Sequence, residues 1–193
     1  MQKYSIFSLI KNAFSNHQNW DLAWKDPTPK KEYDVVIIGG GGHGLATAYY
    51  LAKEHNITNV AIIEKGWIGG GNVGRNTTII RSNFMYDENA LFSEFGMDLW
   101  RKMSQDLNYN VMFSPRGIIN LAHSDAQMNI YARRGNSMRL NGIDAVLLNR
   151  EEVKEIIPMA DFSDNVRFPI FGALMQPSAG TARHDAVAWG YAR

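Results

Sequence analysis

Cysteine is absent from the 193-residue chain, and its charges nearly cancel to a net +1. Without cysteine there is no disulfide framework, thiolate nucleophile or cysteine metal site, which fits a reducing, cytoplasmic location. The near-zero charge gives no electrostatic reason to expect nucleic acid or an acidic membrane surface as a partner. No group of side chains has metal-ligand spacing, so no metal is expected.

Long apolar runs are also missing, since none approaches the roughly eighteen residues of a membrane helix. The apolar segment from Ile6 to Ile10 is interrupted by Ser8 and followed by Lys11, so it does not resemble a secretory signal. With 45% hydrophobic and 20% charged residues, the chain can still build a core. Its last residues, HDAVAWGYAR, begin a helix with no stop signal, which predicts an N-terminal fragment of a longer protein.

A strand, a glycine turn, a helix and a second strand are predicted between residues 33 and 64. YDVVIIG and NVAIIE are short apolar runs typical of strands buried on both faces of a parallel sheet. Between them, Asn56 can end a helix in the left-handed conformation, and the helix itself is predicted by an apolar stripe of Leu45, Ala48, Tyr49 and Ala52. This βαβ pattern predicts an α/β fold.

The rest of the chain predicts helices alternating with antiparallel strands. Asp87 can cap a helix to about Leu107 that carries Leu91, Phe95 and Leu99 on one face. NVMFS and GIINLAHS are expected to be two strands joined at residues 115–117. The later elements are a helix capped by Ser124 and Gln127, a strand AVLLN, a short helix capped by Asn149 and Glu152 and ended by Pro158, a strand over 170–176 and a final helix.

Glycines at the end of the first strand carry the clearest chemical signal. Gly39, Gly41 and Gly44 form G-x-G-x-x-G: the first permits a tight turn, the second lets a pyrophosphate approach the backbone, and the third lets helix and strand pack closely. Bound phosphates would lie at the positive end of the helix. Glu64 ends the second strand, where a carboxylate accepts hydrogen bonds from the adenosine ribose. The pattern predicts a dinucleotide without a 2′-phosphate, and the alternative is a glycine turn that binds no ligand.

The next loop, residues 65–88, indicates whether the expected dinucleotide is FAD or NAD. It is rich in glycine and in hydrogen-bond donors that suit phosphate and the polar edge of an isoalloxazine ring: Asn72, Arg75, Asn76, Thr77 and Thr78. NAD enzymes usually continue directly into another α/β repeat, whereas this chain continues into a long loop and antiparallel strands. The loop therefore favours FAD.

These motifs together resemble the β subunits of heterotetrameric sarcosine oxidases, within the D-amino-acid-oxidase-like FAD-dependent oxidoreductase superfamily. The likeness extends from the arm YSIFSLIKNAFSNHQNW through VVIIGGGGHGLATAYYLAKEHNITNVAIIEKGWIGGGN and GRNTTIIRSN to SQDLNYNVMFSPRG, RLNGID and ARHDAVAWG. It implies oxidative demethylation of sarcosine by non-covalent FAD. It further implies electron transfer to FMN, held covalently by a histidine, and then to oxygen, in a complex with α, γ and δ subunits.

The resemblance also implies roles for individual residues. Arg81, in TTIIRSN, corresponds to an arginine near the flavin and the substrate carboxylate, and His184, in ARHDAVAWG, corresponds to the flavinylated histidine. The residues expected to hold FAD are Gly39, Gly41, Gly42, His43, Gly44, Glu64, Asn72, Arg75, Thr77 and Ile79. For His43, support of the turn is favoured over an acid–base role.

The residues alone make a weaker case for His184. Covalent attachment needs a neutral imidazole nitrogen to add at the flavin 8-methyl carbon, and a position where a loop enters a helix favours the neutral form. An ordinary surface or capping histidine is the alternative. Arg133, Arg134 and Arg139 share one helix and are interpreted as a solvated face or a subunit contact.

The resulting fold prediction is a Rossmann-like FAD-binding domain followed by the start of a mixed-sheet substrate domain. The predicted ranges are an arm of residues 1–32, the first part of the FAD-binding domain at 33–110, the first part of a substrate or interface domain at 111–176, and a returning helix at 177–193. Two other functions stay open. One is a related FAD-dependent amine or amino-acid oxidoreductase of the dimethylglycine dehydrogenase type, and the other is a truncated, non-catalytic FAD-binding fragment.

Overall fold

A computed structural model of the chain describes residues 5–18, 28–163 and 165–193. Contacts divide the described chain into two units. The first takes in residues up to 76 together with 105–110 and 184–193, and the second takes in 77–104 and 111–183. The ranges predicted from the sequence place residues 77–104 in the FAD-binding domain instead, and those ranges stay a prediction.

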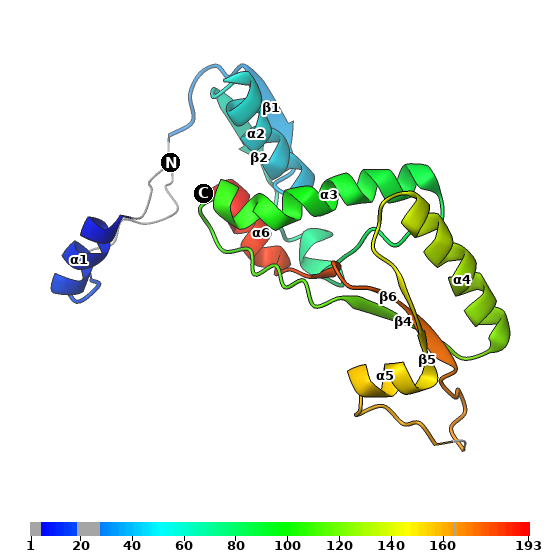
Figure 1. Ribbon diagram of the computed structural model, residues 1–193. Coiled ribbons are helices and arrows are strands. Elements are labelled where there is room, and N and C mark those ends of the chain that lie inside the picture. The colour runs from blue at the N-terminus through cyan, green and yellow to red at the C-terminus, as the bar shows by residue number, and fades with distance from the viewer. Residues whose placement is uncertain (1–4, 19–27, 164) are drawn as a thin grey trace. The chain divides into compact units, whose positions relative to one another are not determined.

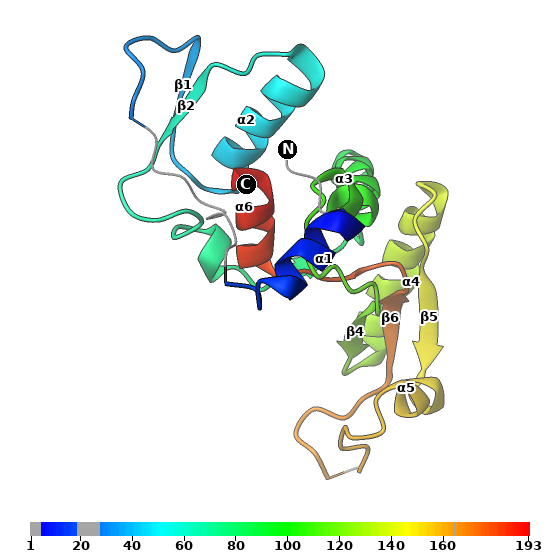
Figure 2. The same cartoon turned by 90° about the vertical axis from the view of Figure 1, so that its left-hand side faces the viewer.

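The first unit is built on a parallel strand pair crossed by a helix. Its elements are α1 (Ile6–Phe14), β1 (Val35–Ile38), α2 (Gly42–His55), β2 (Val60–Ile63), the short 3-10 helix η1 (Val73–Arg75) and α6 (His184–Ala192). Strand β1 pairs in parallel with β2. Helix α2 contacts both strands, and α6 lies against α2 and η1 (Figures 1 and 2). The predicted βαβ unit is confirmed, and Asn56 ends α2 in the left-handed conformation with a φ of 56°.

The second unit is a three-stranded antiparallel sheet with helices packed against it. Its elements are β3 (Ile79–Ile80), α3 (Asp87–Asp106, whose last two residues group with the first unit), β4 (Ile118–Ala122), α4 (Asp125–Leu140), β5 (Val146–Asn149), α5 (Arg150–Ile156), β6 (Gly172–Gln176) and β7 (Gly180–Thr181). The strand order is β4-β6-β5, while β3 pairs with β7. Helices α4 and α5 both contact β6 (Figure 1).

Two apolar clusters form the core of the second unit. One joins α3 and α4 to the sheet through Ala90, Met138, Ile143 and Leu174, and the other joins α5 to the sheet through Leu148, Val153, Ile170 and Ala173. Leu174 and Ala173 are adjacent on β6 and point to opposite faces. The central strand is therefore covered on both sides, which fixes its position within the unit.

The predicted helix starts are confirmed at α4 and α5. The Ser124 hydroxyl accepts a hydrogen bond from the backbone N–H of Gln127. At α5, the Asn149 side chain accepts from the Glu152 backbone N–H, while the Glu152 carboxylate accepts from the Asn149 N–H. Local side-chain chemistry decides these boundaries, so they could be predicted without knowing the fold.

The strand predicted at NVMFS, residues 110–114, is wrong. Met112 has a φ of 55°, which is incompatible with an extended strand. Only Ser114 makes a bridge, to Thr181, and regular pairing begins at Ile118. The segment is apolar because the side chain of Val111 packs in the core, where it is fully buried, and not because the segment forms a strand.

The apolar faces of α1 and α3 are largely exposed within the described chain. Side chains on α1 are exposed to at least 50%, namely Ile6, Phe7, Leu9, Ile10 and Phe14. On α3, the predicted helix is confirmed, but Ala90, Met97 and Met103 are the buried residues, while Leu91 and Phe95 are exposed. Residues 1–4 and 19–27 of the predicted arm lie outside the described residues. None of the helices in the described ranges is both long and apolar enough to cross a membrane.

Candidate functional site

The turn between β1 and α2 has the geometry that G-x-G-x-x-G requires. Gly39 has a φ of +106°, a conformation that favours glycine, and its N–H donates to the Ile63 carbonyl at 2.8 Å. A Cβ on Gly44 would lie 2.0 Å from the Gly39 carbonyl oxygen, so α2 approaches the turn too closely for any side chain there. A Cβ on Gly41 would meet nothing within 4 Å. That space is open to a ligand, as the middle glycine of the motif requires.

Helix α2 begins with backbone N–H groups that no side chain caps. Gly41 is its N-cap residue and offers no side-chain acceptor, and the first intrahelical bond runs from the Leu45 N–H to the Gly41 carbonyl at 3.0 Å. The N–H groups of Gly42, His43 and Gly44 precede that bond and have no intrahelical acceptor. Together with the helix dipole, they suit the negative charge of a pyrophosphate.

The Glu64 carboxylate lies beside this turn. It accepts hydrogen bonds from the Gly40 N–H at 2.7 Å and from the Gly66 N–H at 2.8 Å, one on each oxygen. These two bonds, helped by the charge of Lys65, lower the pKa of the exposed Glu64 carboxyl from its ordinary value of 4.5. A carboxylate has about four acceptor positions. The backbone N–H groups do not use all of these positions, so acceptor capacity remains for hydroxyl donors such as those of a ribose.

A Glu64→Gln change tests this carboxylate. The lowered pKa keeps Glu64 charged in the folded protein, so its contribution is fully present above 4.5, its ordinary pKa, and is lost as pH falls through the lower folded pKa. We expect Glu64→Gln to weaken FAD retention about tenfold near neutral pH and to remove this pH-dependent step. Ultrafiltration of the complete protein at decreasing pH measures retained flavin. Glu32→Gln is the control, and identical profiles for both variants and the parent would contradict the role.

The loop after β2 is fastened to the glycine turn. The Gly69 N–H donates to the Gly40 carbonyl at 2.9 Å, and the Gly74 N–H donates back to Gly69 at 2.9 Å. Asn72 precedes η1 and Arg75 ends it, and both side chains are exposed. Of the predicted FAD residues, Asn72 and Arg75 thus share a unit with the glycine turn and Glu64, whereas Thr77 and Ile79 belong to the second unit.

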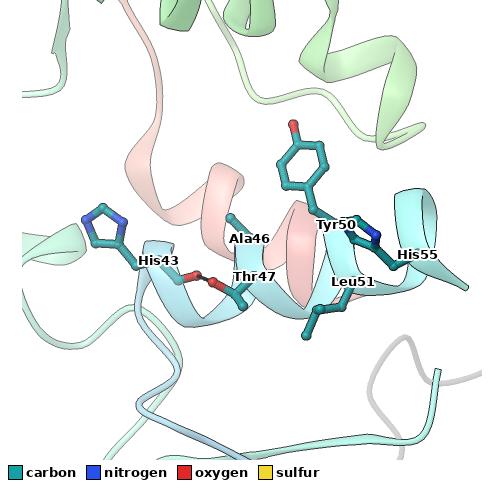
Figure 3. A pocket seen from close by; sticks show the side chains of 6 residues that line it. All are labelled: His43, Ala46, Thr47, Tyr50, Leu51 and His55. Atoms are coloured by element: carbon teal, nitrogen blue, oxygen red, sulfur yellow. Dashed lines mark hydrogen bonds between the residues drawn. The ribbon is translucent and has the colours of Figure 1, made fainter. Parts of the chain in front are cut away.

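His43 lies at one end of a shallow groove along α2 (Figure 3). In Figure 3 its imidazole points away from the other lining side chains, which are Ala46, Thr47, Tyr50, Leu51 and His55. The Thr47 hydroxyl donates to the His43 carbonyl at 2.7 Å, a bond within the first turns of the helix. The imidazole itself is exposed. Neither feature gives the imidazole a contact with the turn, so its support of the turn stays a prediction.

Arg81 lies in the second unit, directly after β3. Its guanidinium donates from Nη1 to the Asn83 side-chain oxygen at 2.5 Å and lies over the Phe84 ring, with Cζ 4.6 Å from the ring centre. Arg134 of α4 reaches the same segment and donates from Nε to the Asn83 carbonyl at 2.6 Å. The prediction of a solvated face is therefore wrong for Arg134, which is half-buried, although Arg133 and Arg139 are exposed.

A buried polar network holds the segment around Arg81. Gln176, at the end of β6, is fully buried; it accepts from the Ser82 N–H at 3.1 Å and donates to the Ser82 hydroxyl at 2.7 Å. The Ser82 hydroxyl donates in turn to Glu94 at 2.6 Å. Sequence reasoning missed this network, although a glutamine closing the apolar run IFGALMQ is the signal that could have found it.

His184 is the first residue of α6 and belongs to the first unit, with the glycine turn. Its Nδ1 atom is buried and has no hydrogen-bond partner. A buried nitrogen without a partner is costly and uncommon. The described chain therefore leaves this ring nitrogen unsatisfied, and attachment of a cofactor at His184 stays a prediction.

The turn, its acidic partner and the parallel βαβ unit define an α/β protein that binds a dinucleotide. Residues 34–193 match the family described as DAO, FAD dependent oxidoreductase, and the chain therefore belongs to that family. The open space at Gly41 and the free acceptor positions of Glu64 fit the phosphates and ribose of FAD.

Two curated relatives are similar to nearly the whole chain. "Sarcosine oxidase subunit beta" of Rhizobium meliloti is 60% identical over 191 residues, which cover 99% of this chain and 46% of that protein. The protein of the same name from Rhodobacter capsulatus is 54% identical over 193 residues, covering 100% of this chain and 46% of that protein. The chain thus spans about half the length of the curated relatives it matches.

The fold is similar to that of solved flavoenzymes. The crystal structure of L-proline dehydrogenase from P. horikoshii matches with a TM-score of 0.74 and 28% identity, covering 85% of this chain and 41% of that one. Because both the sequence family and the fold agree, the predicted Rossmann-like FAD-binding fold is confirmed.

Proposed function

We propose that the chain is part of the β subunit of a sarcosine oxidase, which oxidatively demethylates sarcosine with FAD. The observation that carries the proposal is the 60% identity to a protein named sarcosine oxidase subunit beta over 99% of the chain. The open glycine turn and Glu64 support the choice of cofactor. Bound FAD would supply the oxidising chemistry, taking a hydride from the N-methyl carbon. Sarcosine also loses its N–H proton, and the resulting imine is hydrolysed or passed to folate.

The residues of the chain bind and orient in this scheme. The N–H groups at the start of α2 hold the pyrophosphate, and Glu64 accepts the ribose hydroxyls. Arg81 holds the substrate carboxylate by a bidentate pair of hydrogen bonds. Fixing that carboxylate orients the N-methyl group, and no strong base is required of the protein.

His184 is proposed to hold FMN covalently. The linkage replaces one imidazole hydrogen and one hydrogen of the flavin 8-methyl group by a carbon–nitrogen bond, and oxygen removes the corresponding electron pair. The buried Nδ1 without a protein partner supports the assignment because the described chain does not commit that nitrogen to a hydrogen bond. Electrons would then pass from FAD to FMN and on to oxygen, in a complex with α, γ and δ subunits.

A second candidate is another FAD-dependent amine or amino-acid oxidoreductase, of the dimethylglycine dehydrogenase type. The likeness to an L-proline dehydrogenase, at 28% identity, favours it specifically because proline is also a secondary amine. A third candidate is a non-catalytic FAD-binding fragment. The test includes it because the chain covers only 46% of the length of the Rhizobium meliloti relative.

Anaerobic mixing of the complete flavoprotein with candidate amines tests the proposal. Bleaching of flavin absorbance should be fastest with sarcosine, and slower by roughly tenfold or more with N,N-dimethylglycine and L-proline, because a site selective for sarcosine would have to accommodate the extra methyl group or the ring. Faster bleaching with either competitor would replace the proposal by the second candidate. A protein that binds FAD but is reduced by none of the three would be the non-catalytic case.

A further inference from the structure

Among the described residues, the Arg81 guanidinium has no acidic partner, but two neutral side chains hold it. It donates to the Asn83 side chain and stacks on Phe84, and no ion pair involves it within the described residues of the second unit. A guanidinium without a carboxylate partner is available for an anionic ligand. Its direction is then set by the neutral groups that hold it.

Asn83 is the group that touches the guanidinium. It is fully buried, and its side-chain oxygen faces Arg81. Because a guanidinium carries only donors, the amide must present its oxygen rather than its nitrogen. The amide nitrogen is consequently buried without a partner. A buried N–H group without an acceptor lowers the stability of the folded protein. The protein therefore keeps this orientation of the Asn83 amide although it is destabilising.

Arg134 fixes Asn83 from the other side. It donates from both Nε and Nη2 to the Asn83 backbone carbonyl. Burial lowers the pKa of Arg134, and the positive charge of Arg81 lowers it further, so the two cations lie near each other. Two neighbouring guanidinium groups, neither in an ion pair within the described chain, favour a negatively charged ligand between or beside them.

The backbone next to Asn83 is also immobilised. Ser82 is fully buried, and Gln176 holds both its N–H and its hydroxyl. Segment 81–83 is therefore fixed to the sheet by Ser82 and to α4 by the Asn83 carbonyl. Of its three residues, the side chain of Asn83 is the one that connects this fixed backbone to the guanidinium.

We propose that Asn83 is a positioning residue that holds the Arg81 guanidinium in place for the substrate carboxylate, and that Arg134 anchors Asn83. This inference rests on the proposed function, in which Arg81 binds the carboxylate. Asn83 itself does not touch the substrate. Its removal should therefore weaken substrate binding more than the subsequent oxidation.

Steady-state kinetics of the complete flavoprotein test the role of the side chain. Asn83→Ala removes the hydrogen bond to Arg81 but keeps the backbone carbonyl that Arg134 binds. We expect KM for sarcosine to rise roughly ten- to hundredfold, with kcat changed less than about threefold. Asn83→Asp preserves the shape and places a carboxylate on Arg81, so it should raise KM at least as much by competing with substrate. Asn129→Ala, an exposed asparagine on α4, is the control.

Arg134→Lys tests the anchor, with Arg133→Lys as the matched control on the adjacent exposed position. Lysine cannot make both bonds to the Asn83 carbonyl, so KM should rise roughly tenfold in Arg134→Lys alone. Binding of acetate, a carboxylate without an amine, is followed by the change in flavin absorbance and should weaken in parallel. A loss of kcat with unchanged KM and acetate affinity in the Asn83 variants would overturn the inference.

Different results would contradict the proposed oxidation of sarcosine and the proposed positioning role of Asn83. If the parent protein is not reduced by sarcosine, the proposed function is wrong, whatever the variants do. If the parent oxidises sarcosine and binds acetate, but Asn83→Ala and Asn83→Asp match Asn129→Ala in KM, only the positioning role is wrong. Should Asn83→Ala fail to fold, the isosteric Asn83→Asp variant and the Arg134 pair still decide.

Discussion

Gly41→Ala is expected to yield a folded protein that has lost FAD. The site of the missing Cβ is open, with no atom within 4 Å, so the methyl group has room in the protein itself. In the proposed site, the pyrophosphate approaches the N–H groups at the start of α2 through that same space. Losing two such charge-assisted hydrogen bonds corresponds to roughly a hundredfold or greater loss of affinity.

The neighbouring glycine separates binding from folding. A Cβ on Gly44 would lie 2.0 Å from the Gly39 carbonyl oxygen, so Gly44→Ala must displace α2 from the turn. We expect it to lose FAD and also to destabilise the fold by about 1–3 kcal/mol. Thermal melting followed by circular dichroism, together with the flavin-to-protein absorbance ratio, distinguishes the two variants.

Gly96→Ala is the matched control for both. Gly96 lies in the middle of α3, and a Cβ there also meets nothing within 4 Å. Alanine should stabilise the helix by about 0.5–1 kcal/mol and leave the flavin content unchanged. If Gly41→Ala retained FAD as well as Gly96→Ala does, the turn would not be the phosphate site, and the assignment of the cofactor to this turn would fail.

The parts of the molecule that could be predicted from the sequence are those determined by near neighbours in the chain. The turn at Gly39 and the left-handed end of α2 at Asn56 depend on conformations that few residues adopt. The caps at Ser124 and Asn149 depend on side chains three residues away. The parallel pairing of β1 with β2 follows because a helix connects two short apolar strands.

The parts that could not be predicted depend on distant pairs. Gln176 and Ser82 are separated by 94 residues, and Arg134 and Asn83 by 51. Only Gln176 has a local signal, at the end of the apolar run IFGALMQ; a serine, an asparagine and an arginine are all common on surfaces, so no local pattern marks the other three residues. The wrong strand prediction at residues 110–114 also comes from a distant contact. Val111 is buried in the core rather than in a sheet, and its carbonyl accepts a hydrogen bond from the Arg183 N–H instead of from a neighbouring strand.

His184 is another residue that lies far from the glycine turn in the sequence but in the same unit of the structure. It follows the glycine turn by about 140 residues, yet α6 contacts α2 and η1 in the first unit. The close approach is visible at Gly69, where a Cβ would lie 3.1 Å from the Ala188 side chain on α6. Helix α6 therefore packs in the unit that carries the glycine turn.

His184→Asn is expected to abolish covalent flavin while leaving FAD in place. Because Nδ1 has no hydrogen-bond partner, the substitution breaks no bond at that atom, and asparagine is well tolerated near the start of a helix. Gly41 and Glu64 are untouched, so FAD should remain at the parent level. Acid precipitation should then give a colourless pellet from His184→Asn and a yellow pellet from the parent.

The control and the site assignment come from the same samples. His55→Asn, at the exposed end of α2, should keep the yellow pellet. Mass analysis of the parent should find a flavin-sized addition on the peptide that contains His184, and on no peptide of the variant. Acid-stable flavin in His184→Asn, or sarcosine oxidation by a parent protein without any covalent flavin, would refute the two-flavin proposal. In the second case the electron pair would pass from FAD to its acceptor without an intermediate flavin, as in a single-flavin amine oxidoreductase.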